Sequence, residues 1–446
     1  MSKYSVKGNH KYSVVLGLGS NIEPIKHLRS ALAEIKRLAE VTVVNVASIY
    51  ESDALLPVNA PNTWNKKYLN SAVEIEVSNF EPLKLLKDIK TIERKLGRTG
   101  TNRWAPRNID IDILWVQDFT LTSEALNIPH AQILNRPFAL LPLLELRPDF
   151  SFNEPSSSEG QQLPDWMWQN PKPFHTEISK TYVWPKFAGI LNITEDSFSG
   201  DGLMTSITLR LGQLLDAGAE IIDIGAESTR PGAVVIDPAV EYRRLATTLD
   251  VINKYKADYS RHFEISIDSR KPEVMQKTVN NYHIDYLNDV EGFRQPKMRE
   301  VLKLTSAKAI CMHSFSVPPL KTETISENED LWVYLTRWWE KQRELFSKDN
   351  ISLDRMIFDP GIGFGKTPQQ SVDLLNYLEG LSAIKEEIYL GYSRKSFLSL
   401  MTDKPASERD PETALVTEAV NQAYAQYLRV HDVAQNKQAI TLRTLL

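Results

Sequence analysis

Features of secreted, membrane-spanning and disulfide-stabilised proteins are scarce in this 446-residue sequence. Its single cysteine, Cys311, excludes an internal disulfide framework, and its place in the apolar run 307–312 predicts a buried structural thiol rather than a nucleophile. No apolar run approaches the roughly 20 residues that a membrane span needs. Residues 1–11 lack the apolar core of a secretory signal and the Arg-rich pattern of a transit peptide. We therefore expect a cytoplasmic protein with no membrane partner.

A large excess of charge of one sign is also lacking. The formal net charge is −5, so the chain does not have the basic character that nucleic-acid binding requires. The eight histidines show no close pairing at the spacing of metal ligands. A hydrophobic fraction of 42% and a charged fraction of 24% are those of an ordinary globular protein. A chain of this length favours two or three domains.

Strand and helix patterns are mixed in the first third of the chain. Apolar runs or alternation predict strands over 14–18, 41–50 and 68–77. Apolar residues at helical spacing predict helices over 25–40 and 82–96. We expect Ser20 or Asn21 to cap the first of these helices. The pattern favours an α+β sandwich of the ferredoxin-like kind, with helices packed on a sheet.

Two aspartates with one residue between them follow these elements. Strand alternation over 108–114 places Asp110 and Asp112 on one face and the isoleucines between them on the other. Two carboxylates this close repel each other. Solvation at the surface is one way to tolerate the repulsion, and a divalent cation is another. Magnesium takes one or two carboxylates together with phosphate oxygens and water.

A cationic segment lies just before the aspartates. Residues 97–107 have no apolar period and contain Arg98, Arg103 and Arg107, with Trp104 among them. The fork of an arginine side chain matches phosphate geometry better than the point charge of a lysine. No glycine-rich phosphate loop of the Walker type occurs in this part of the sequence. Arginines and paired carboxylates together favour a magnesium–nucleotide site.

Several motifs of this region resemble the hydroxymethyldihydropterin pyrophosphokinase family over about residues 12–149. They are Gly17-Leu18-Gly19-Ser20-Asn21, the pair Tyr68 and Asn70, the segment 98–112 with Arg-Trp-x-Pro-Arg-x-x-Asp-x-Asp, and Ile128-Pro129-His130 followed by Arg136 and Phe138. The resemblance implies transfer of a pyrophosphoryl group from ATP to the hydroxymethyl group of 6-hydroxymethyl-7,8-dihydropterin. The segment 52–64 departs from the family pattern, and Ala131 replaces an aromatic residue beside the histidine.

The same resemblance implies roles for individual residues. Asp110 and Asp112 hold two magnesium ions, while Arg98 and Arg107 grip phosphates and act with the aspartates in catalysis. The implied pterin-binding residues are Tyr68 and Phe138, whose rings sandwich the heterocycle, with Asn70 and Trp104. The implied nucleotide-binding residues are Glu93, Arg98, Arg107, His130 and Arg136. Core packing is the alternative interpretation of Tyr68 and Phe138.

A linker is predicted between two halves of the chain. Residues 151–186 are rich in Ser, Glu, Gln, Pro and Trp and show no sustained period. We expect a first domain over 1–160, a linker over 161–184 and a second domain over 185–446.

Strand candidates recur through the second half at the spacing of a barrel. They cover 187–193, 220–224, 263–267, 284–290, 307–312, 356–359, 388–391 and 427–430, with helical patterns between most of them. Eight such units in about 260 residues predict a (β/α)8 TIM barrel. A doubly wound open sheet is the alternative. The strand count and the lack of a Gly-x-Gly-x-x-Gly turn argue against it.

Polar residues of different kinds follow these strands. Active sites of such barrels lie at the C-terminal ends of the strands. We expect Lys366, Lys395, Arg429 and His431 to form an anion-binding end, and Asp268, Asn288 and Asp359 to form a hydrogen-bonding end. The run Gly365-Lys366-Thr367 is not a Walker loop, because the residue five positions before Gly365 is Pro360 rather than glycine.

These strand ends closely resemble those of dihydropteroate synthase, from about residue 186 to the C-terminus. The motifs Asn-Ile-Thr-x-Asp-Ser-Phe-Ser, Glu-Ser-Thr-Arg-Pro-Gly, Asp-Pro-Gly-x-Gly-Phe-Gly-Lys, Ser-Arg-Lys-Ser and Arg-Val-His-Asp-Val occur in the family's order. The resemblance implies condensation of dihydropterin pyrophosphate with 4-aminobenzoate and release of pyrophosphate. Glu195 departs from a proline expected in the first loop.

Barrel residues receive roles from this resemblance alone. Asp268 and Lys395 are implied to be catalytic, and Asn192 is implied to be a ligand of magnesium. The implied substrate-binding residues are Thr229, Arg230, Asp268, Asn288, Met312, Asp359, Phe364, Lys366, Ser393, Lys395, Arg429 and His431. Among them, Thr229 and Arg230 shape the aminobenzoate pocket, and Arg429 and His431 hold pyrophosphate with Asn192.

The two halves fit consecutive steps of folate biosynthesis. The implied partners are ATP, magnesium, the pterin, 4-aminobenzoate and sulfonamides that compete with it, and the barrel is expected to form a homodimer. A barrel methyltransferase that binds a methylated folate is one alternative, but it gives no role to the first half. A non-catalytic pterin-binding scaffold is another, and it predicts loss of the carboxylates at 110 and 112, which are present.

Overall fold

The chain forms two compact units that divide between Trp184 and Pro185 in a computed structural model. The structure describes residues 11–98, 104–148, 150, 179–181, 185–193, 203–227, 235–259, 262–320, 322–421 and 424–445. Each unit has its own sheet and its own apolar core. Among the helices in these ranges, none combines the length and the apolar character that crossing a bilayer demands.

The first unit is built on an antiparallel sheet. Its strands are β1 (Lys11–Ser20), β2 (Val41–Val46), β3 (Ile49–Ser52), β4 (Tyr68–Ser78), β5 (Asp110–Val116) and β8 (Ser179–Thr181). The order is β5-β1-β4-β3-β8, and β2 also pairs with β4. Central β1 therefore lies between the third and fourth long strands of the chain, as in a ferredoxin-like βαββαβ unit. The α+β prediction is confirmed.

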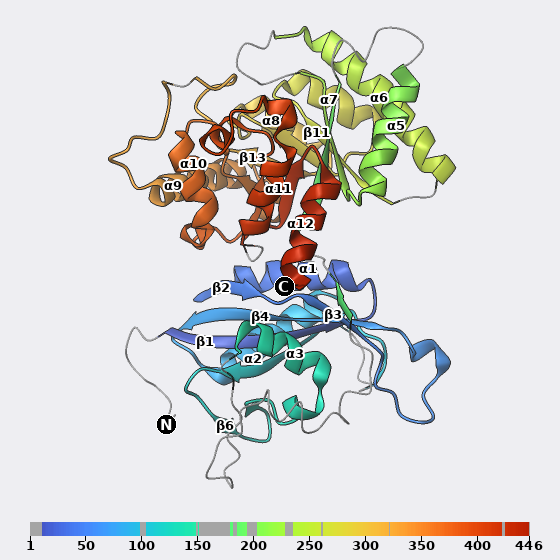
Figure 1. The fold of residues 1–446 in the computed structure, drawn as a ribbon, viewed down its shortest axis with the longest axis vertical. Helices are drawn as coiled ribbons and strands as arrows, with labels where there is room; N and C mark the ends of the chain where they lie inside the picture. The colour runs from blue at the N-terminus through green and yellow to red at the C-terminus, as the bar shows by residue number, and fades with distance from the viewer. Residues whose placement is uncertain are drawn as a thin grey trace. The chain divides into compact units, whose positions relative to one another are not determined.

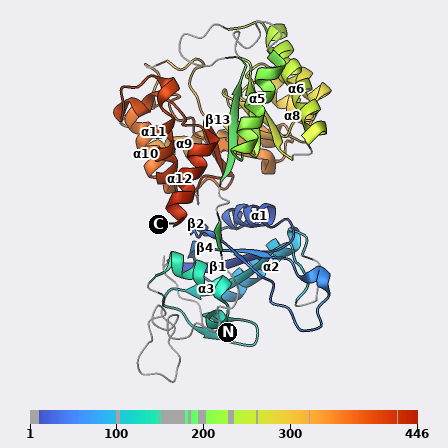
Figure 2. The same ribbon diagram turned by 45° about the vertical axis from the view of Figure 1, so that its right-hand side comes forward.

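Helices cover both faces of this sheet (Figure 2). The helices are α1 (Pro24–Arg37), α2 (Pro82–Lys95) and α3 (Pro137–Leu146). Alternation along β1 sends Val14, Leu16 and Leu18 to the side of α1, and Val15 to a core that includes Leu140 and Leu143 of α3. The apolar period predicts α1 and α2 to within a few residues. A small hairpin, β6 (Leu121–Thr122) and β7 (Asn127–Ile128), precedes α3.

Two local expectations for this unit are wrong. The predicted strand 41–50 is divided into β2 and β3, because the backbone N–H and hydroxyl of Ser48 donate to Glu145 of α3 at 2.9 and 2.8 Å instead of continuing the ladder. Helix α1 has Glu23 as its N-cap, without a side-chain capping bond. Asn21 instead accepts a hydrogen bond from the backbone N–H of Arg107 at 2.8 Å, so it holds the C-terminal end of the cationic segment.

The second unit is a closed barrel of eight parallel strands (Figure 1). They are β9 (Lys186–Asn192), β10 (Ile221–Gly225), β11 (Glu264–Asp268), β12 (Tyr286–Asp289), β13 (Lys308–Met312), β14 (Met356–Asp359), β15 (Glu387–Leu390) and β16 (Tyr427–Val430). The helices around them in the described ranges are α5 (Leu203–Asp216), α6 (Pro238–Tyr259), α7 (Pro272–Asn281), α8 (Pro296–Lys303), α9 (Leu331–Lys348), α10 (Pro368–Asn376), α11 (Asp410–Ala419) and α12 (Val433–Leu445). All eight predicted strands are confirmed.

Inward-facing side chains fill the barrel in layers drawn from alternate strands, as the strand period of two requires. From the N-terminal ends, the layers are Lys186, Glu264, Lys308 and Glu387; then Ile221, Tyr286, Ile357 and Tyr427; then Ala188, Ser266, Ile310 and Tyr389; then Asp223, Asn288, Asp359 and Arg429. Apolar layers thus separate a charged layer at one end from a polar layer at the other.

The charged layer closes the N-terminal end with two ion pairs. Lys308 Nζ lies 2.6 Å from Glu387 Oε2, and Lys186 Nζ lies 2.6 Å from Glu264 Oε2. We expect Lys308→Met to lower the free energy of unfolding by about 2 kcal/mol, because Glu387 loses its cation while its side chain is only 15% exposed. This loss lies between the typical contributions of surface ion pairs and of buried ion pairs. Denaturant titration measures the loss. Lys303→Met, in an exposed pair with Glu300, is the control and should change little.

Candidate active sites

A cavity of about 470 Å³ opens on the face of the first sheet that carries α3. Its floor is formed by Gly17 and Gly19 of β1. The register places Asp112 and Asp110 of β5 beside these glycines on one side. Ala72 and Asn70 of β4 lie beside them on the other. A Cβ atom at Gly17 would meet Leu114 at 2.9 Å, and one at Gly19 would meet the Asn70 amide oxygen at 3.2 Å. The glycines therefore let the side chains of Leu114 and Asn70 pack closely against β1 at the cavity.

Asp110 stands between two arginines at the edge of this cavity. Its Oδ1 accepts a hydrogen bond from Arg98 at 2.5 Å, and its Oδ2 accepts one from Arg107 at 2.7 Å. Burial alone would raise the pKa of Asp110, but the two guanidinium groups outweigh it and the pKa is lowered. Asp110 is thus held as a carboxylate by the same arginines that the sequence predicted to face phosphate.

Glu93 of α2 links Arg98 to the backbone of β5 beside Asp110. Its carboxylate accepts hydrogen bonds from Lys90 at 2.8 Å and from the backbone N–H of Ile111 at 2.7 Å, and Arg98 lies 2.6 Å away. Burial raises the pKa of Glu93, although these cations oppose the rise. Lys90, which sequence reasoning missed, lines the cavity and lies 3.8 Å from Asp112. Its position one helical turn before Glu93 was the feature of the sequence that could have identified it as a site residue.

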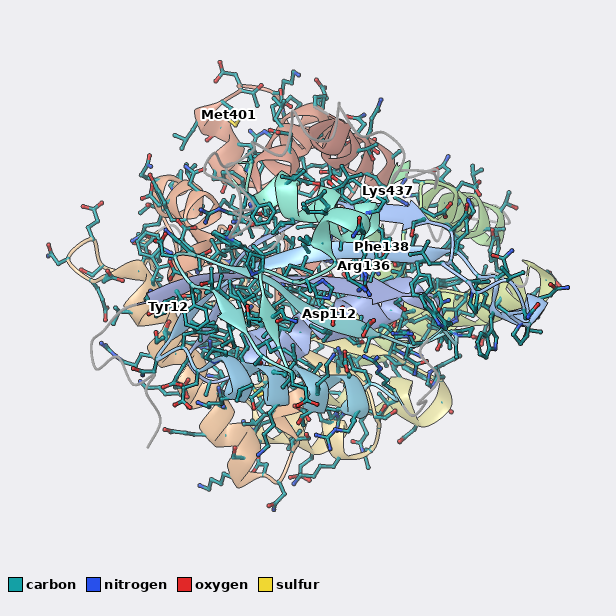
Figure 3. All side chains as sticks on the ribbon, turned by 90° about the horizontal axis from the view of Figure 1, so that it is seen from below. Tyr12, Asp112, Arg136, Phe138, Met401 and Lys437 are labelled. Carbon is teal, nitrogen blue, oxygen red and sulfur yellow. The ribbon has the colours of Figure 1, made fainter. Side chains whose placement is uncertain are left out.

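Asp112 has looser surroundings than Asp110. Arg136 lies 3.9 Å from its Oδ2, and that arginine also donates to Gln132 at 2.6 Å. His130 lines the same cavity, and burial lowers the pKa of its imidazole while Asp112 opposes the shift. Asp112, Arg136 and Phe138 lie close together in Figure 3. The two aspartates therefore share one face, as predicted, but differ in how tightly cations hold them.

Two aromatic rings predicted to bind a flat heterocycle line this cavity. Tyr68 is at the start of β4 and Phe138 is at the start of α3. Burial raises the pKa of the Tyr68 hydroxyl, and Arg107 opposes the rise. Asn70 is buried and donates to Ser52 Oγ at 2.9 Å, which leaves its oxygen toward Gly19. Trp104 also lines the cavity and is 41% exposed.

The donor set suits magnesium better than zinc. Within the described part of the chain, no group of three or more Asp, Glu, His or Cys side chains is placed to hold a metal ion. Asp110 and Asp112 provide two carboxylates on one face, which is the number magnesium uses when phosphate oxygens and water complete its shell. Among the arginines predicted for this site, Arg103 lies outside the described residues.

The polar layer of the barrel forms the second candidate site. Arg429 donates from Nε to Asp223 Oδ2 at 2.6 Å and from a terminal nitrogen to Asp268 Oδ2 at 2.7 Å. Asp223 is fully buried and also accepts from Ser266 at 2.5 Å and Asn288 at 3.4 Å. Arg429, which was expected at the anion-binding end, thus contacts two carboxylates, one of them Asp268 of the expected hydrogen-bonding end.

Asp268 lies at the upper edge of this layer. Burial raises the pKa of Asp268 to about 7, although Arg429 opposes the rise. Asp359, on β14, accepts from the backbone N–H of Gly361 at 2.8 Å, and burial raises its pKa against the effect of Lys395. Asn288 lies beside Asp268 in the register of β11 and β12. The structure thus brings all three residues of the predicted hydrogen-bonding end together.

Lys395 reaches the site from the loop after β15. Its ammonium donates to the carbonyl of Ile362 at 2.7 Å and lies 4.8 Å from the centre of the Phe364 ring. Burial lowers the pKa of Lys395 to about 8, and Asp359 opposes the shift. Phe364 packs with Met312 and Val290 in a small apolar cluster. A cation and an apolar wall therefore lie side by side.

Lys366 lies in a different environment from the other cations of the expected anion-binding end. Its ammonium contacts His313 Nδ1 at 3.0 Å and donates to the carbonyls of Gly361 and Phe364 at 3.2 and 3.1 Å. Burial lowers the pKa of Lys366 to about 7. These contacts fold the glycine-rich loop after β14 around the lysine.

The remaining predicted barrel residues are partly described. His431 Nδ1 lies 2.9 Å from Ser393 Oγ, which fixes the two side chains against each other. Asn192, at the end of β9, is exposed. Its side-chain oxygen and the side chain of Asp268 lie on either side of Gly225. Thr229, Arg230 and Glu195 lie outside the described residues. Asp223 is the residue that sequence reasoning missed.

Two family models match the two units. Residues 15–148 match the family described as 7,8-dihydro-6-hydroxymethylpterin-pyrophosphokinase. Residues 188–431 match the family described as pterin binding enzyme. The matched ranges contain the cavity over the first sheet and the polar layer of the barrel, respectively.

Similar proteins span nearly the whole chain. The folate synthesis bifunctional protein of Chlamydia muridarum is 33% identical over 442 residues, which cover 96% of each chain. The mitochondrial folate synthesis bifunctional protein of Pisum sativum is 31% identical and is covered to 88%. Dihydropteroate synthase from Anaplasma phagocytophilum with bound 6-hydroxymethylpterin-monophosphate is 31% identical over 59% of this chain and 99% of its own, with a TM-score of 0.53. The Plasmodium falciparum HPPK-DHPS triple mutant with pteroate covers 98% of this chain at 20% identity and a TM-score of 0.53, which shows a shared fold. This chain belongs to the bifunctional folate synthesis family, in which a hydroxymethyldihydropterin pyrophosphokinase domain is followed by a dihydropteroate synthase domain.

Proposed function

We propose that the cavity over the first sheet is the site of pyrophosphoryl transfer from ATP to 6-hydroxymethyl-7,8-dihydropterin. The single observation that carries this is that Asp110, Asp112, Tyr68 and Phe138 all line one cavity. A flat heterocycle fits between aromatic faces. Its hydroxymethyl group would then point toward the carboxylates and arginines.

Positioning and charge neutralisation account for this step. Phosphoryl transfer needs the attacking and leaving oxygens in line and the phosphate charge compensated. We assign Arg98 and Arg107 to the phosphates, since their guanidinium groups already lie at the cavity edge beside Asp110. Magnesium, when held by Asp110 and Asp112, supplies charge neutralisation at the phosphates. The residues assigned to the nucleotide are Glu93, His130 and Arg136, and those assigned to the pterin edge are Asn70 and Trp104.

For the barrel we propose condensation of the pterin pyrophosphate with 4-aminobenzoate at the C-terminal ends of the strands. Asp268, Asn288, Asp359 and Lys395 supply carboxylates, an amide and an ammonium that match the ring edge of a pterin. Met312 and Phe364 pack on its face, and Lys366 shapes the loop that carries Phe364. Arg429, His431 and Asn192 face the pyrophosphate. Neutralising that leaving group favours C–O cleavage as the aromatic amine attacks.

Three further assignments accompany these reactions. Magnesium is the metal ion of both sites. Asp110 and Asp112 are its ligands in the first, and Asn192 is its ligand in the second. Thr229, Arg230 and Ser393 border the aminobenzoate. The barrel forms a homodimer, and we place the domains at 1–160 and 185–446 with a linker at 161–184.

One coupled assay tests the whole proposal. The purified chain, ATP, magnesium, hydroxymethyldihydropterin and 4-aminobenzoate together should yield AMP, pyrophosphate and dihydropteroate. Supplying the pterin pyrophosphate directly should bypass the need for ATP. Dihydropteroate formation that still requires ATP when the pterin pyrophosphate is supplied would contradict separate sites.

A sulfonamide should inhibit the second reaction in competition with 4-aminobenzoate. Both are para-substituted anilines with a polar group opposite the amine, so both should occupy one pocket. We expect the apparent KM for 4-aminobenzoate to rise with sulfonamide concentration while kcat stays constant. Initial rates at several concentrations of both compounds measure this. Inhibition that lowers kcat at saturating 4-aminobenzoate would contradict the shared pocket.

A further inference from the structure

His313, just after β13, is a buried residue that the proposed chemistry does not use. Its backbone N–H donates to the carbonyl of Asp359 at 2.9 Å, so it continues the ladder between β13 and β14. The side chain is almost fully buried, and its ring lies nearly perpendicular to the rings of Phe315, Tyr334 and Trp338, with centroid distances of 5.3, 5.6 and 5.1 Å. The imidazole is therefore packed among three aromatic rings next to the polar layer of the barrel.

One polar contact connects this imidazole to the glycine-rich loop after β14. Its Nδ1 lies 3.0 Å from the side-chain nitrogen of Lys366, whereas Nε2 has no hydrogen-bond partner among the described residues. Burial, together with the charge of Lys366, lowers the pKa of His313 well below its usual value, so the ring is neutral. Because an ammonium group can only donate, Nδ1 accepts this hydrogen bond and the ring proton lies on Nε2.

Lys366 extends the connection to the backbone of its own loop. It is buried and also donates to the carbonyls of Gly361 and Phe364, so His313 is the third acceptor for three N–H donors. The loop also lies directly against the backbone after β13. Gly361 has a φ of +69°, and a Cβ atom there would clash with the carbonyl of His313. A hydrogen bond and a close backbone contact thus hold the loop on His313.

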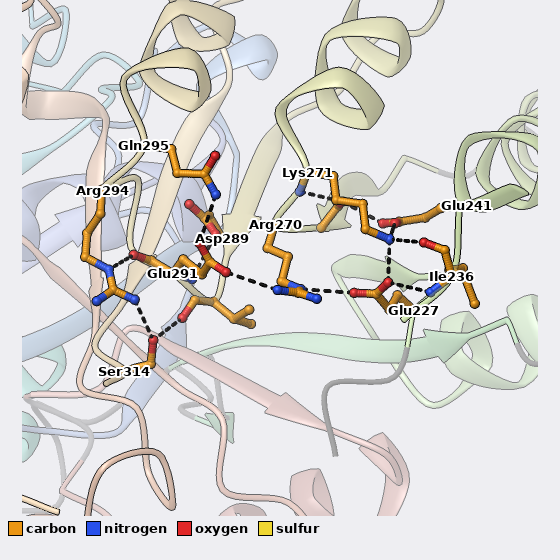
Figure 4. Close-up of polar contacts among 12 residues, drawn as sticks. Glu227, Ile236, Glu241, Arg270, Lys271, Asp289, Glu291, Arg294, Gln295 and Ser314 are labelled. Carbon is orange, nitrogen blue, oxygen red and sulfur yellow. Dashed lines mark hydrogen bonds and ion pairs between the residues drawn. The ribbon is translucent and has the colours of Figure 1, made fainter. Parts of the chain in front are cut away.

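The same segment holds the apolar cluster of the second site. Phe364 of the loop packs with Met312 and Val290. Met312 directly precedes the histidine, and Ser314, which directly follows it, donates to the carbonyl of Val290 at 2.7 Å. Arg294 in turn donates to Ser314 at 3.5 Å (Figure 4). The three residues 312–314 are therefore linked to every member of this cluster.

We infer that His313 is a positioning residue for the face of the pterin in the synthase reaction. It accepts from Lys366, Lys366 holds the loop, and the loop places Phe364, which we assigned to the face of the pterin. This inference rests on the proposed function of the barrel. A buried donor that loses its acceptor is costly. Without Nδ1, Lys366 must move to find another acceptor, and its two bonds to the loop carry Phe364 with it.

Two substitutions separate the acceptor from the ring. His313→Phe keeps an aromatic ring but removes Nδ1. His313→Asn loses the ring, but its Oδ1 stands where Nδ1 stood and can accept from Lys366. His313→Leu has nearly the shape of the asparagine without an acceptor, and it serves if His313→Phe does not fold.

Kinetics of the second reaction at saturating 4-aminobenzoate test the inference. His313→Phe should raise the KM for supplied pterin pyrophosphate about 10-fold, less than the roughly 10²-fold that a displacement of about 1 Å can cause. Its kcat should change less than about 2-fold, which is the pattern of lost substrate binding. His313→Asn should change that KM less than about 2-fold. Denaturant titration should nevertheless show His313→Asn to be less stable than His313→Phe, because it loses the packing of the ring.

Two further variants complete the experiment. In a Lys366→Met background, His313→Phe should add less than about 2-fold to the KM, because the donor is already gone. Tyr334→Leu is the matched control, since it removes a ring packed on His313 without touching the hydrogen bond to the loop. It should lower stability and leave the KM unchanged.

Three results would overturn the inference: an unchanged KM in His313→Phe, an equal rise in His313→Asn or Tyr334→Leu, or full additivity with Lys366→Met. A wild-type chain that forms no dihydropteroate from the supplied substrates would refute the proposed function itself, and the inference with it.

Discussion

Asp110→Ala should reduce the pyrophosphokinase rate by about 10³-fold and leave the synthase rate unchanged. Loss of this carboxylate removes one of two predicted metal ligands, and metal-assisted charge neutralisation contributes several kcal/mol to such reactions. It also leaves Arg98 and Arg107 without the partner that now orients them at 2.5 and 2.7 Å. Both effects act on phosphate positioning. Neither reaches the barrel, whose polar layer consists of other residues.

Separate assays of the two reactions measure this prediction. AMP formation from ATP and hydroxymethyldihydropterin reports the first, and dihydropteroate formation from supplied pterin pyrophosphate reports the second. Asp110→Asn keeps the shape and should be nearly as inactive as Asp110→Ala. Glu76→Gln is the matched control, since Glu76 is also a carboxylate paired with a cation, 2.8 Å from Lys11, but is not part of the cavity wall. Loss of both reactions in Asp110→Ala would contradict independent sites.

Much of this fold follows from short-range patterns. Most barrel strands contain an apolar run, and polar residues at or just after the strand ends mark the C-terminal rim, so the strands and the rim were both predictable. The Asp110 and Asp112 face followed from alternation alone. The division of the predicted strand 41–50 into β2 and β3 could not be predicted in this way. It depends on the hydrogen bond from Ser48 to Glu145, which lies 97 residues away in the sequence.

Asp223 shows where sequence reasoning stops. A carboxylate inside the run Ile221-Ile222-Asp223-Ile224 was visible, but its partner Arg429 is 206 residues away. The barrel places them together because both belong to the layer formed by alternate strands. That pairing places Arg429, which was expected at the anion-binding end, in contact with Asp268 of the hydrogen-bonding end. Knowledge of strand register, rather than of residue type, was missing.

Lys395→Ala should have the reverse effect of Asp110→Ala. We expect the synthase rate to fall by about 10²- to 10³-fold, the usual loss for one preorganised charged donor, with the pyrophosphokinase unchanged. The ammonium lies against Phe364 and donates to Ile362, so its removal takes away both a charge and a wall of the site. The assays described for Asp110 separate the two reactions here as well. Equal loss of both activities would argue against this assignment.

The pH dependence gives an independent test of the same lysine. Burial lowers the pKa of Lys395 to about 8, so the charged form is lost as the pH rises through that value. If the charge binds the pterin, kcat/KM for the pterin pyrophosphate should decline above about pH 8 in the wild-type chain. Lys395→Arg, whose guanidinium stays protonated, should remove this decline even if its overall rate is lower. A decline that persists unchanged in Lys395→Arg would mean that another group titrates there. The buried Lys366, whose pKa is about 7, would predict an earlier decline, so the position of the inflection distinguishes the two lysines.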